Sequence, residues 1–141
     1  MHTTDIHVCD DIDPAFAALL EQGLNGFNDV AVGYGDRTPL AVVLSDAQTH
    51  QPIGGAVGRS SLGLLFLDLF YLPATLRGRG LGSEILRKFE TEGQRRGCVS
   101  AVLYTISFQA PEFYKRHGWK VFGEIPCAPT GTSRIFLTKT L

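Results

Sequence analysis

The chain has few cysteines, and this scarcity excludes two kinds of structural support. Three occur among 141 residues, at Cys9, Cys98 and Cys127. An odd, widely spaced set makes neither a disulfide framework nor a zinc knuckle, and no two histidines have metal-ligand spacing. We therefore expect free thiols in a reducing compartment and no metal site.

Long apolar runs and an excess of charge of one sign are also missing. No run reaches the roughly 18 apolar residues of a membrane-spanning helix, and the first residues carry no basic-then-apolar leader. The formal net charge of −1 gives no electrostatic footprint for nucleic acid or for an anionic membrane. The sequence thus predicts a cytoplasmic protein without nucleic-acid or membrane partners. Its length predicts one domain over residues 1–141.

The most informative segment is a glycine-rich turn at residues 77–82, which read Arg-Gly-Arg-Gly-Leu-Gly. It lies between an apolar run and a helical pattern over residues 83–97. A strand, a glycine turn and a helix N-terminus form an anion site, because unpaired amides and the helix dipole point at one spot. The two arginines add positive charge, so a phosphate-bearing ligand is the expected occupant.

Two familiar classes of glycine loop do not fit this turn. A P-loop has a lysine followed by Ser or Thr after its last glycine, whereas this chain has Leu81-Gly82-Ser83. The dinucleotide fingerprint G-x-G-x-x-G would need one more residue, and residues 97–102 supply no acid for the ribose. From the turn alone, a tight loop with solvated arginines is as good an interpretation as a phosphate site.

The downstream sequence decides between these interpretations. R-x-x-G-x-G at the start of a helix resembles the acetyl-CoA loop of the GCN5-related N-acetyltransferases. That family continues with N-x-x-A-x-x-x-Y-x-x-x-G-[FW], and the chain matches this spacing with one departure, a serine in place of the asparagine. The matching residues are Ser107, Ala110, Tyr114, Gly118 and Trp119. The resemblance is specific over residues 64–119 and looser from Pro39 onward, and the first ~35 residues carry no signature of the family.

The periodicity and the turn residues predict a series of strands and helices. The helices are expected at residues 15–24, 83–97 and 112–117, and a short helix or a mobile loop at 25–37. Strands are expected at 6–9, 40–44, 53–59, 62–72, 98–106, 119–122 and 135–139, the fourth of them covered on both faces. The fold class is therefore α/β (mixed α+β). The resemblance implies a central mixed, mostly antiparallel sheet flanked by helices, with splayed strands that form an acetyl-CoA cleft.

The resemblance also implies an activity and a way of holding the carrier. The activity is the transfer of an acetyl group from acetyl-CoA to the primary amine of a small molecule, by direct attack in a ternary complex. The amides of residues 79–83 would receive the pyrophosphate and the pantetheine arm would lie beside the long strand. Gln109 would substitute for the amide that Ser107 lacks, because alternation in an extended segment would keep both residues on one face. The implied carrier-binding residues are Phe70, Tyr71, Leu72, Arg77, Gly78, Arg79, Gly80, Leu81, Gly82, Ser83, Ser107 and Gln109.

Two residues are candidates for the proton transfers. Tyr114 matches the family tyrosine, and a phenol with an ordinary pKa of about 10 holds a proton that it can give to the leaving thiolate. From spacing alone it would be a core tyrosine. Asp68 is the carboxylate within the long apolar strand, where burial would make it a stronger base. Its alternative is a solvent-facing position or a cap on a neighbouring amide. His117 is expected to interact with the dipole at the end of its short helix.

The acceptor and the assembly are less determined. Phe16, Phe27, Tyr34 and Phe108 would wall an acceptor pocket or belong to an ordinary core. A protein or peptide N-acetyltransferase and a non-catalytic acyl-CoA-binding module remain as alternative functions. The resemblance implies a possible homodimer, in which residues 135–141 would take part.

Overall fold

The computed structural model describes residues 3–141, which divide into a unit that ends at Asp36 and a unit from Arg37 to Leu141. Each unit is described by itself. Within residues 3–141, no helix combines the length and the hydropathy needed to cross a bilayer. In the same range no three His, Cys, Asp or Glu side chains cluster as metal ligands.

The first unit contains one helix, α1 (Pro14–Val32). The Asp13 side chain accepts a hydrogen bond from the Ala15 amide at 2.8 Å, which caps the first turn, and Gly33 closes the helix with a φ of 91°. The helix extends through residues 25–32, beyond its predicted end, because an interior glycine costs only about 1 kcal/mol of helix stability. The predicted strand at residues 6–9 is wrong, since these residues have no regular structure.

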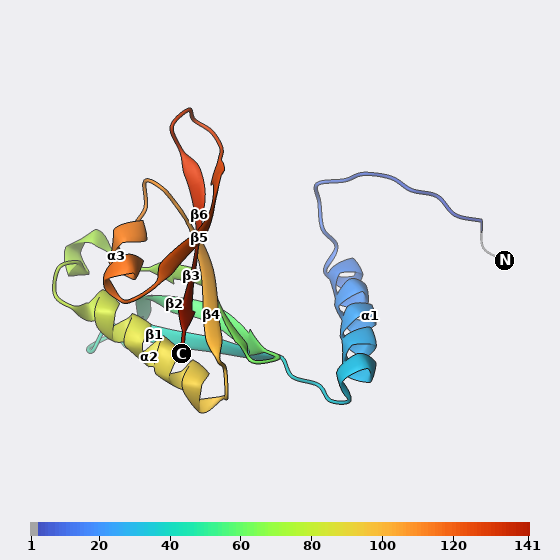
Figure 1. Ribbon diagram of the computed structural model, residues 1–141, viewed down its shortest axis with the longest axis horizontal. Coiled ribbons are helices and arrows are strands. Elements are labelled where there is room, and N and C mark those ends of the chain that lie inside the picture. The colour runs from blue at the N-terminus through green and yellow to red at the C-terminus, as the bar shows by residue number, and fades with distance from the viewer. Residues whose placement is uncertain (1–2) are drawn as a thin grey trace. The chain divides into compact units, whose positions relative to one another are not determined.

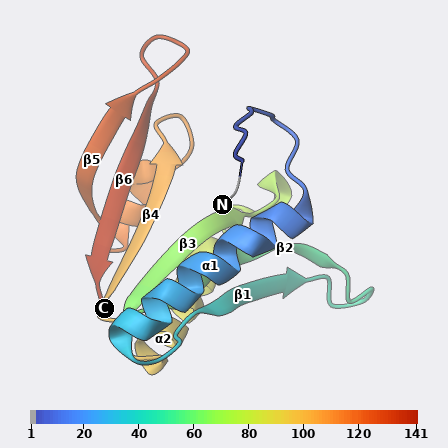
Figure 2. The same cartoon turned by 90° about the vertical axis from the view of Figure 1, so that its right-hand side faces the viewer.

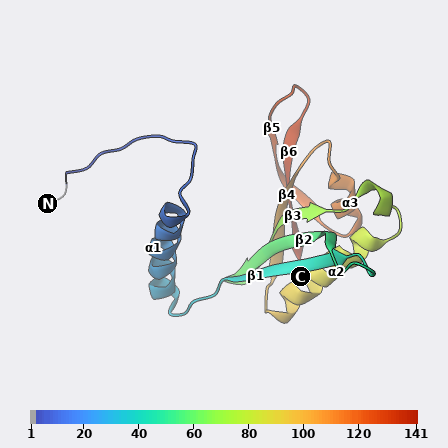
Figure 3. The ribbon, with the colours of Figure 1, turned by 180° about the vertical axis from the view of Figure 1, so that it is seen from behind.

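The second unit is built on a six-stranded sheet with the order β1-β2-β3-β4-β6-β5 (Figure 1). All neighbouring strands are antiparallel except β3 and β4, so the expected mixed, mostly antiparallel sheet is confirmed. The view from behind in Figure 3 shows β1 at one edge of the sheet. The strands are β1 (Thr38–Ser45), β2 (Pro52–Ser61), β3 (Leu64–Tyr71), β4 (Ser100–Ile106), β5 (Lys120–Pro126) and β6 (Ser133–Thr140).

The position of β6 limits how residues 135–141 could take part in the expected homodimer. β6 pairs with β4 on one side and with β5 on the other, so residues 135–141 offer no free backbone edge to a second copy. Backbone pairing between two copies would have to use β5 or β1, which are the two edge strands of the sheet.

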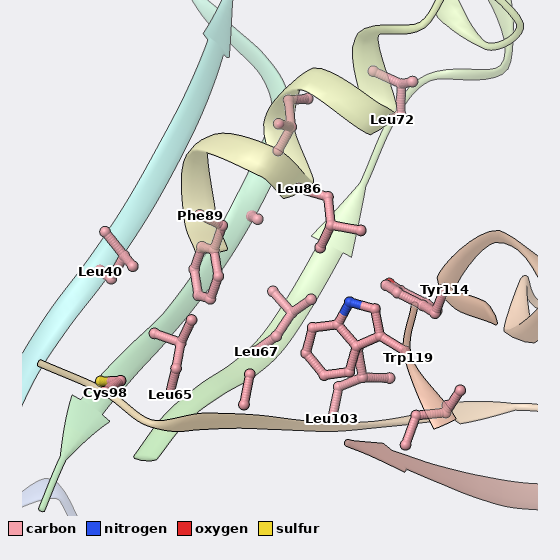
Figure 4. Packing of buried hydrophobic residues seen from close by; sticks show 14 of the residues in the cluster. Leu40, Leu65, Leu67, Leu72, Leu86, Phe89, Cys98, Leu103, Tyr114 and Trp119 are labelled. Atoms are coloured by element: carbon pink, nitrogen blue, oxygen red, sulfur yellow. The ribbon is translucent and has the colours of Figure 1, made fainter. Parts of the chain in front are cut away.

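The helix α2 (Leu81–Arg95) covers the core of the sheet. Its buried side chains Leu86 and Phe89 point toward Leu65 and Leu67 of β3, as Figure 4 shows. The helix is amphipathic as its sequence predicts, and this apolar stripe fixes its angle on the sheet. A 3₁₀ turn, η1 (Ala74–Leu76), links β3 to the glycine turn, and a short helix α3 (Pro111–Arg116) follows β4.

Two glycines of β2 permit very close approach of the neighbouring backbones. A Cβ on Gly58 would lie 1.8 Å from the carbonyl oxygen of Phe66, and one on Gly55 would lie 2.1 Å from that of Val42. The register between β2 and β3 shifts next to Gly58, so one residue of β3, Asp68, is left in a bulge. This bulge bends β3 where it borders the site described below.

The expectation for the long apolar run 62–72 is wrong in two respects. Leu62 and Gly63 form a hairpin turn with positive φ angles of 48° and 80°, so the strand begins at Leu64. Beyond the bulge, Leu69 and Tyr71 are 70% and 61% exposed, so β3 is not covered on both faces. The bulge also interrupts the alternation along the strand, so that Asp68 and Leu69 are both exposed.

Candidate active site

The parallel strands β3 and β4 pair over only three residues before they separate. The pairs are Leu64 with Ser100, Leu65 with Ala101 and Phe66 with Val102. Figure 2 shows the two strands diverging from this common end. A cleft of about 720 Å³ opens beyond it, lined by the end of β3, the glycine turn, β4 and α3. The predicted splay of two strands around a cleft is thus present.

The glycine turn leaves free amides at the start of α2. Gly78 and Gly80 have φ angles of 79° and 80°, a left-handed conformation that glycine adopts without strain. The first amide of the helix with a backbone partner is that of Glu84, which donates to the Gly80 carbonyl at 3.1 Å. Among residues 3–141, the amides of residues 81–83 donate to no protein group. Free amides at a helix N-terminus are ready to bind an anion.

Only part of the turn borders the cleft. Gly78, Gly80, Gly82 and Ser83 line it, whereas Arg79 and Leu81 are not lining residues. Arg77 also lines the cleft, but its Nε donates to the carbonyl oxygen of Leu72 at 2.9 Å. This bond fixes the guanidinium against the end of β3 and keeps its charge beside the turn.

Near this end of the cleft, Arg116 and one contact of His117 escaped the sequence analysis. Arg116, in the last turn of α3, lines the cleft and adds a cation. The Nε2 of His117 lies 2.9 Å from the Oγ of Ser83, and its ring packs against Phe113 with centroids 4.9 Å apart. The ring of His117 therefore contacts the start of α2. The sequence analysis considered only the dipole of the short helix that ends at His117, so it did not anticipate this contact.

Tyr114 lies in the wall of the cleft within an aromatic cluster. Its ring packs edge-on against Phe70 and Trp119, with centroid distances of 6.3 and 6.1 Å, and the residue is 8% exposed. Burial raises the pKa of Tyr114 to about 12. No buried polar side-chain atom among the described residues lacks a partner, and no protein hydrogen bond of this hydroxyl is found there. The hydroxyl therefore reaches the surface of the cleft as a protonated phenol.

The structure separates the two residues proposed for the asparagine position. The Oγ of Ser107 accepts a hydrogen bond from the Ser133 amide at 3.0 Å, and Ser107 does not line the cleft. Gln109 does line it, and its Oε1 accepts bonds from the Thr105 hydroxyl and the Ile106 amide. The segment after β4 forms a turn and is not extended, so Ser107 and Gln109 do not lie on one face. Gln109 alone can present an amide to a ligand.

Asp68 takes the solvent-facing position, which is one of the two alternatives that the sequence left open. It stands in the bulge of β3 and lines the cleft, with a side chain that is 46% exposed. Nη1 of Arg59 donates to both of its carboxylate oxygens, at 3.1 and 3.0 Å. The bulge turns this residue away from the core, so the burial expected to strengthen it as a base is absent.

Phe70, Tyr71 and Leu72, which the resemblance places beside the carrier, line the cleft. Phe108 lines it too, whereas Phe16, Phe27 and Tyr34 belong to the first unit.

Comparison with known proteins supplies the family. The description "Acetyltransferase (GNAT) family" matches residues 13–119, which is most of the chain. An acetyltransferase of Agrobacterium fabrum is 28% identical over 116 residues, which cover 82% of this chain and 84% of the relative. Blasticidin-S acetyltransferase of Streptomyces morookaense is 37% identical over 89 residues, or 62% of this chain and 65% of the relative.

Solved structures agree with these relatives. A crystal structure of an inferred acetyltransferase from Agrobacterium tumefaciens has a TM-score of 0.90 at 25% identity, covering 98% of this chain and all of the other. An acetyltransferase from Bacillus cereus ATCC 14579 has a TM-score of 0.76 at 25% identity, covering 96% of this chain and 98% of the other. The protein is an acetyl-CoA-dependent acyltransferase, and the chain belongs to the GNAT family of acetyltransferases.

Proposed function

We propose that the protein transfers the acetyl group of acetyl-CoA to the primary amine of a small molecule, by direct attack in a ternary complex. One observation carries the proposal: a single cleft is bordered both by the free amides of the glycine turn and by the protonated phenol of Tyr114. The first group suits the diphosphate of the carrier and the second suits its leaving thiolate.

The free amides of residues 81–83 would hold the diphosphate, with Arg77 and Arg116 offsetting its charge. The hydrogen bond between His117 and Ser83 would orient the serine hydroxyl at the same spot. The pantetheine arm would lie along Phe70, Tyr71 and Leu72 and reach Gln109 across the cleft. This arrangement places the thioester where β3 and β4 diverge.

Acetyl-CoA supplies an activated acyl group, and the reaction forms a C–N bond while it breaks a C–S bond. The neutral amine attacks the thioester carbonyl carbon, the attacking nitrogen gives up one proton to water, and the tetrahedral intermediate then expels the thiolate. The Tyr114 hydroxyl donates its proton to that sulfur and regains one from solvent. Because burial raises the pKa of Tyr114 to about 12, the Tyr114 hydroxyl is protonated at any physiological pH.

The amine must lose its own proton before it attacks. Asp68 stands at the mouth of the cleft with nearly half of its side chain in contact with solvent. We assign it to draw the ammonium form of the acceptor to the cleft and to pass its proton to water. Half exposure suits this relay, since a proton taken by the carboxylate leaves at once to the solvent.

A small acceptor is favoured by one relative. The protein at 37% identity is named for the acetylation of blasticidin S, which is a small molecule rather than a polypeptide. Asp68 is the one carboxylate among the residues that line the cleft, whereas a groove for basic peptides would be expected to carry several.

The test is acetyl-CoA turnover with a panel of small amines, amino acids and peptides, followed by release of the free thiol. Turnover with small amines supports the proposal. Turnover restricted to peptides would replace it with peptide acetylation. Binding of CoA without release of thiol across the panel would make the protein an acyl-CoA-binding module.

A further inference from the structure

The opening between β3 and β4 has an outer side, of which the proposed function uses Asp68 alone. Asp68 of β3 and Tyr104 of β4 each lie two residues beyond the last paired position of their strand. The residues just before them, Leu67 and Leu103, are 6% and 4% exposed and face the core. Asp68 and Tyr104 therefore face the other side of the sheet, and both line the cleft.

A neighbouring arginine makes Asp68 part of an exposed ion pair. The guanidinium of Arg59, on β2, lies over the ring of Phe66 at 4.0 Å from its centroid. Only Nη1 contacts the carboxylate of Asp68, so Nε and Nη2 point away from it. The two side chains are 50% and 46% exposed. Each partner thus keeps hydrogen-bonding capacity toward solvent.

The charge of this pair selects among acceptors. A simple ammonium ion beside Asp68 is attracted by the carboxylate and repelled by the Arg59 cation a few ångströms away, so the two terms largely cancel. An acceptor with an ammonium and a carboxylate on the same carbon atom matches both partners. Its carboxylate takes the free donors of the guanidinium, the geometry in which arginine binds carboxylates most strongly.

We propose that Asp68 and Arg59 form the acceptor subsite and that the acceptor is an α-amino acid. Its amino group contacts Asp68 at the cleft, and its carboxylate contacts the outward edge of Arg59. Its side chain lies toward Tyr104, which is 61% exposed and packs on Phe136 of β6 with centroids 5.6 Å apart. This inference rests on the proposed function and deepens it by naming the substrate class.

The experiment compares amino acids with the amines that lack only the carboxylate. The panel pairs phenylalanine with phenethylamine, leucine with isopentylamine and lysine with cadaverine, and kcat/KM is measured by thiol release. The wild-type protein is expected to prefer the amino acid at least tenfold in its best pair. Arg59→Gln is expected to reduce that preference at least fivefold, mainly through the KM of the amino acid. Arg95→Gln, which removes an exposed, ion-paired arginine of α2, is the matched control and keeps the preference.

The outcomes separate the two proposals. Equal use of amino acid and amine by the wild-type protein, or an unchanged preference in Arg59→Gln, overturns the subsite and leaves the proposed function standing. No thiol release with any member overturns both. If Arg59→Gln fails to fold, Arg59→Lys keeps the charge with a single donor group and is expected to lose part of the preference. An undiminished preference in Arg59→Lys together with an unaltered one in Asp68→Asn also overturns the subsite.

Discussion

At the scale of single residues, Tyr114 illustrates how packing prepares a side chain for chemistry. Phe70, Phe113 and Trp119 surround its ring, which removes water from the phenol and raises its pKa to about 12. An exposed tyrosine would begin to ionise near pH 10. The cluster therefore keeps the acid protonated and aims it at the cleft.

Tyr114→Phe is expected to lower kcat by about 10²-fold to 10⁴-fold, the usual contribution of a general acid. The ring packing is retained and the amides of residues 81–83 are untouched, so the Kd for CoA changes little. Stopped-flow turnover and calorimetry measure the two quantities. An unchanged kcat would remove Tyr114 as the acid, and a Kd that rises together with the loss of kcat would indicate a role in binding.

Gly80 supports a second prediction at this scale. Its φ of 80° costs a residue with a side chain roughly 1–2 kcal/mol, although a Cβ would meet no atom within 4 Å. Gly80→Ala is therefore expected to lower stability by that amount and to weaken CoA binding about tenfold, as the turn relaxes. Gly63→Ala is the matched control, because Gly63 has the same φ and equal space outside the cleft. Equal CoA affinity of the two variants would contradict a role of the turn in binding.

At the scale of elements, the C-terminal end of α2 is tied to two strands through Arg96. Its Nη1 donates to the carbonyl oxygens of Thr38 and Pro39 and to the Ser60 hydroxyl, each at 3.1 Å. Glu92 holds this arginine in place with a hydrogen bond of 2.9 Å from Nε. These hydrogen bonds of Arg96, which we call the Arg96 contacts, fix the C-terminal end of α2, and the N-terminal end of the same helix carries the free amides.

The stabilisation of the folded protein by the Arg96 contacts depends on pH through Glu92. Hydrogen bonds from Arg95 and Arg96 lower the pKa of Glu92 to about 2 from its ordinary value of 4.5. Because the folded-state pKa is lowered, the stabilisation is present above pH 4.5 and is lost as the pH falls toward 2. Glu92→Gln is thus expected to have a lower urea midpoint than the wild type at pH 7, with the gap closing below pH 4.5. Glu112→Gln, which removes an exposed ion pair with Lys115 alone, serves as the control. A gap that persists at pH 2 would contradict the ion-pair account.

The elements also show what sequence patterns can and cannot predict. The glycine turn, α2 and the strands around it follow from local signals, since glycine spacing and periodicity depend on near neighbours. The strand at 6–9 failed because apolar alternation does not supply a pairing partner. The sequence could not choose between a buried and an exposed Asp68, because the bulge that exposes it depends on the pairing of β3 with β2. The bond between His117 and Ser83 joins residues 34 positions apart and has no local signal.

At the scale of the whole molecule, we propose that residues 1–141 work as a single acetyltransferase domain, although two compact units are distinguished within it. Thermal unfolding of the full chain is then expected to show one transition, followed by far-ultraviolet and by tyrosine signals together. Saturating CoA at 100 times its Kd should stabilise the folded state by about 2.7 kcal/mol and shift that single transition upward. Two transitions, of which CoA moves only one, would contradict the single domain.

The central claim is that the free amides at the start of α2 bind the diphosphate of the carrier. At 15.4 kDa the protein is suited to amide NMR spectroscopy, and the direct measurement is a titration of the labelled chain with CoA and, separately, with pantetheine. The account predicts that the amide signals of Leu81, Gly82 and Ser83 shift strongly with CoA and much less with pantetheine, which lacks the diphosphate. Bound CoA that leaves these three signals in place would contradict it.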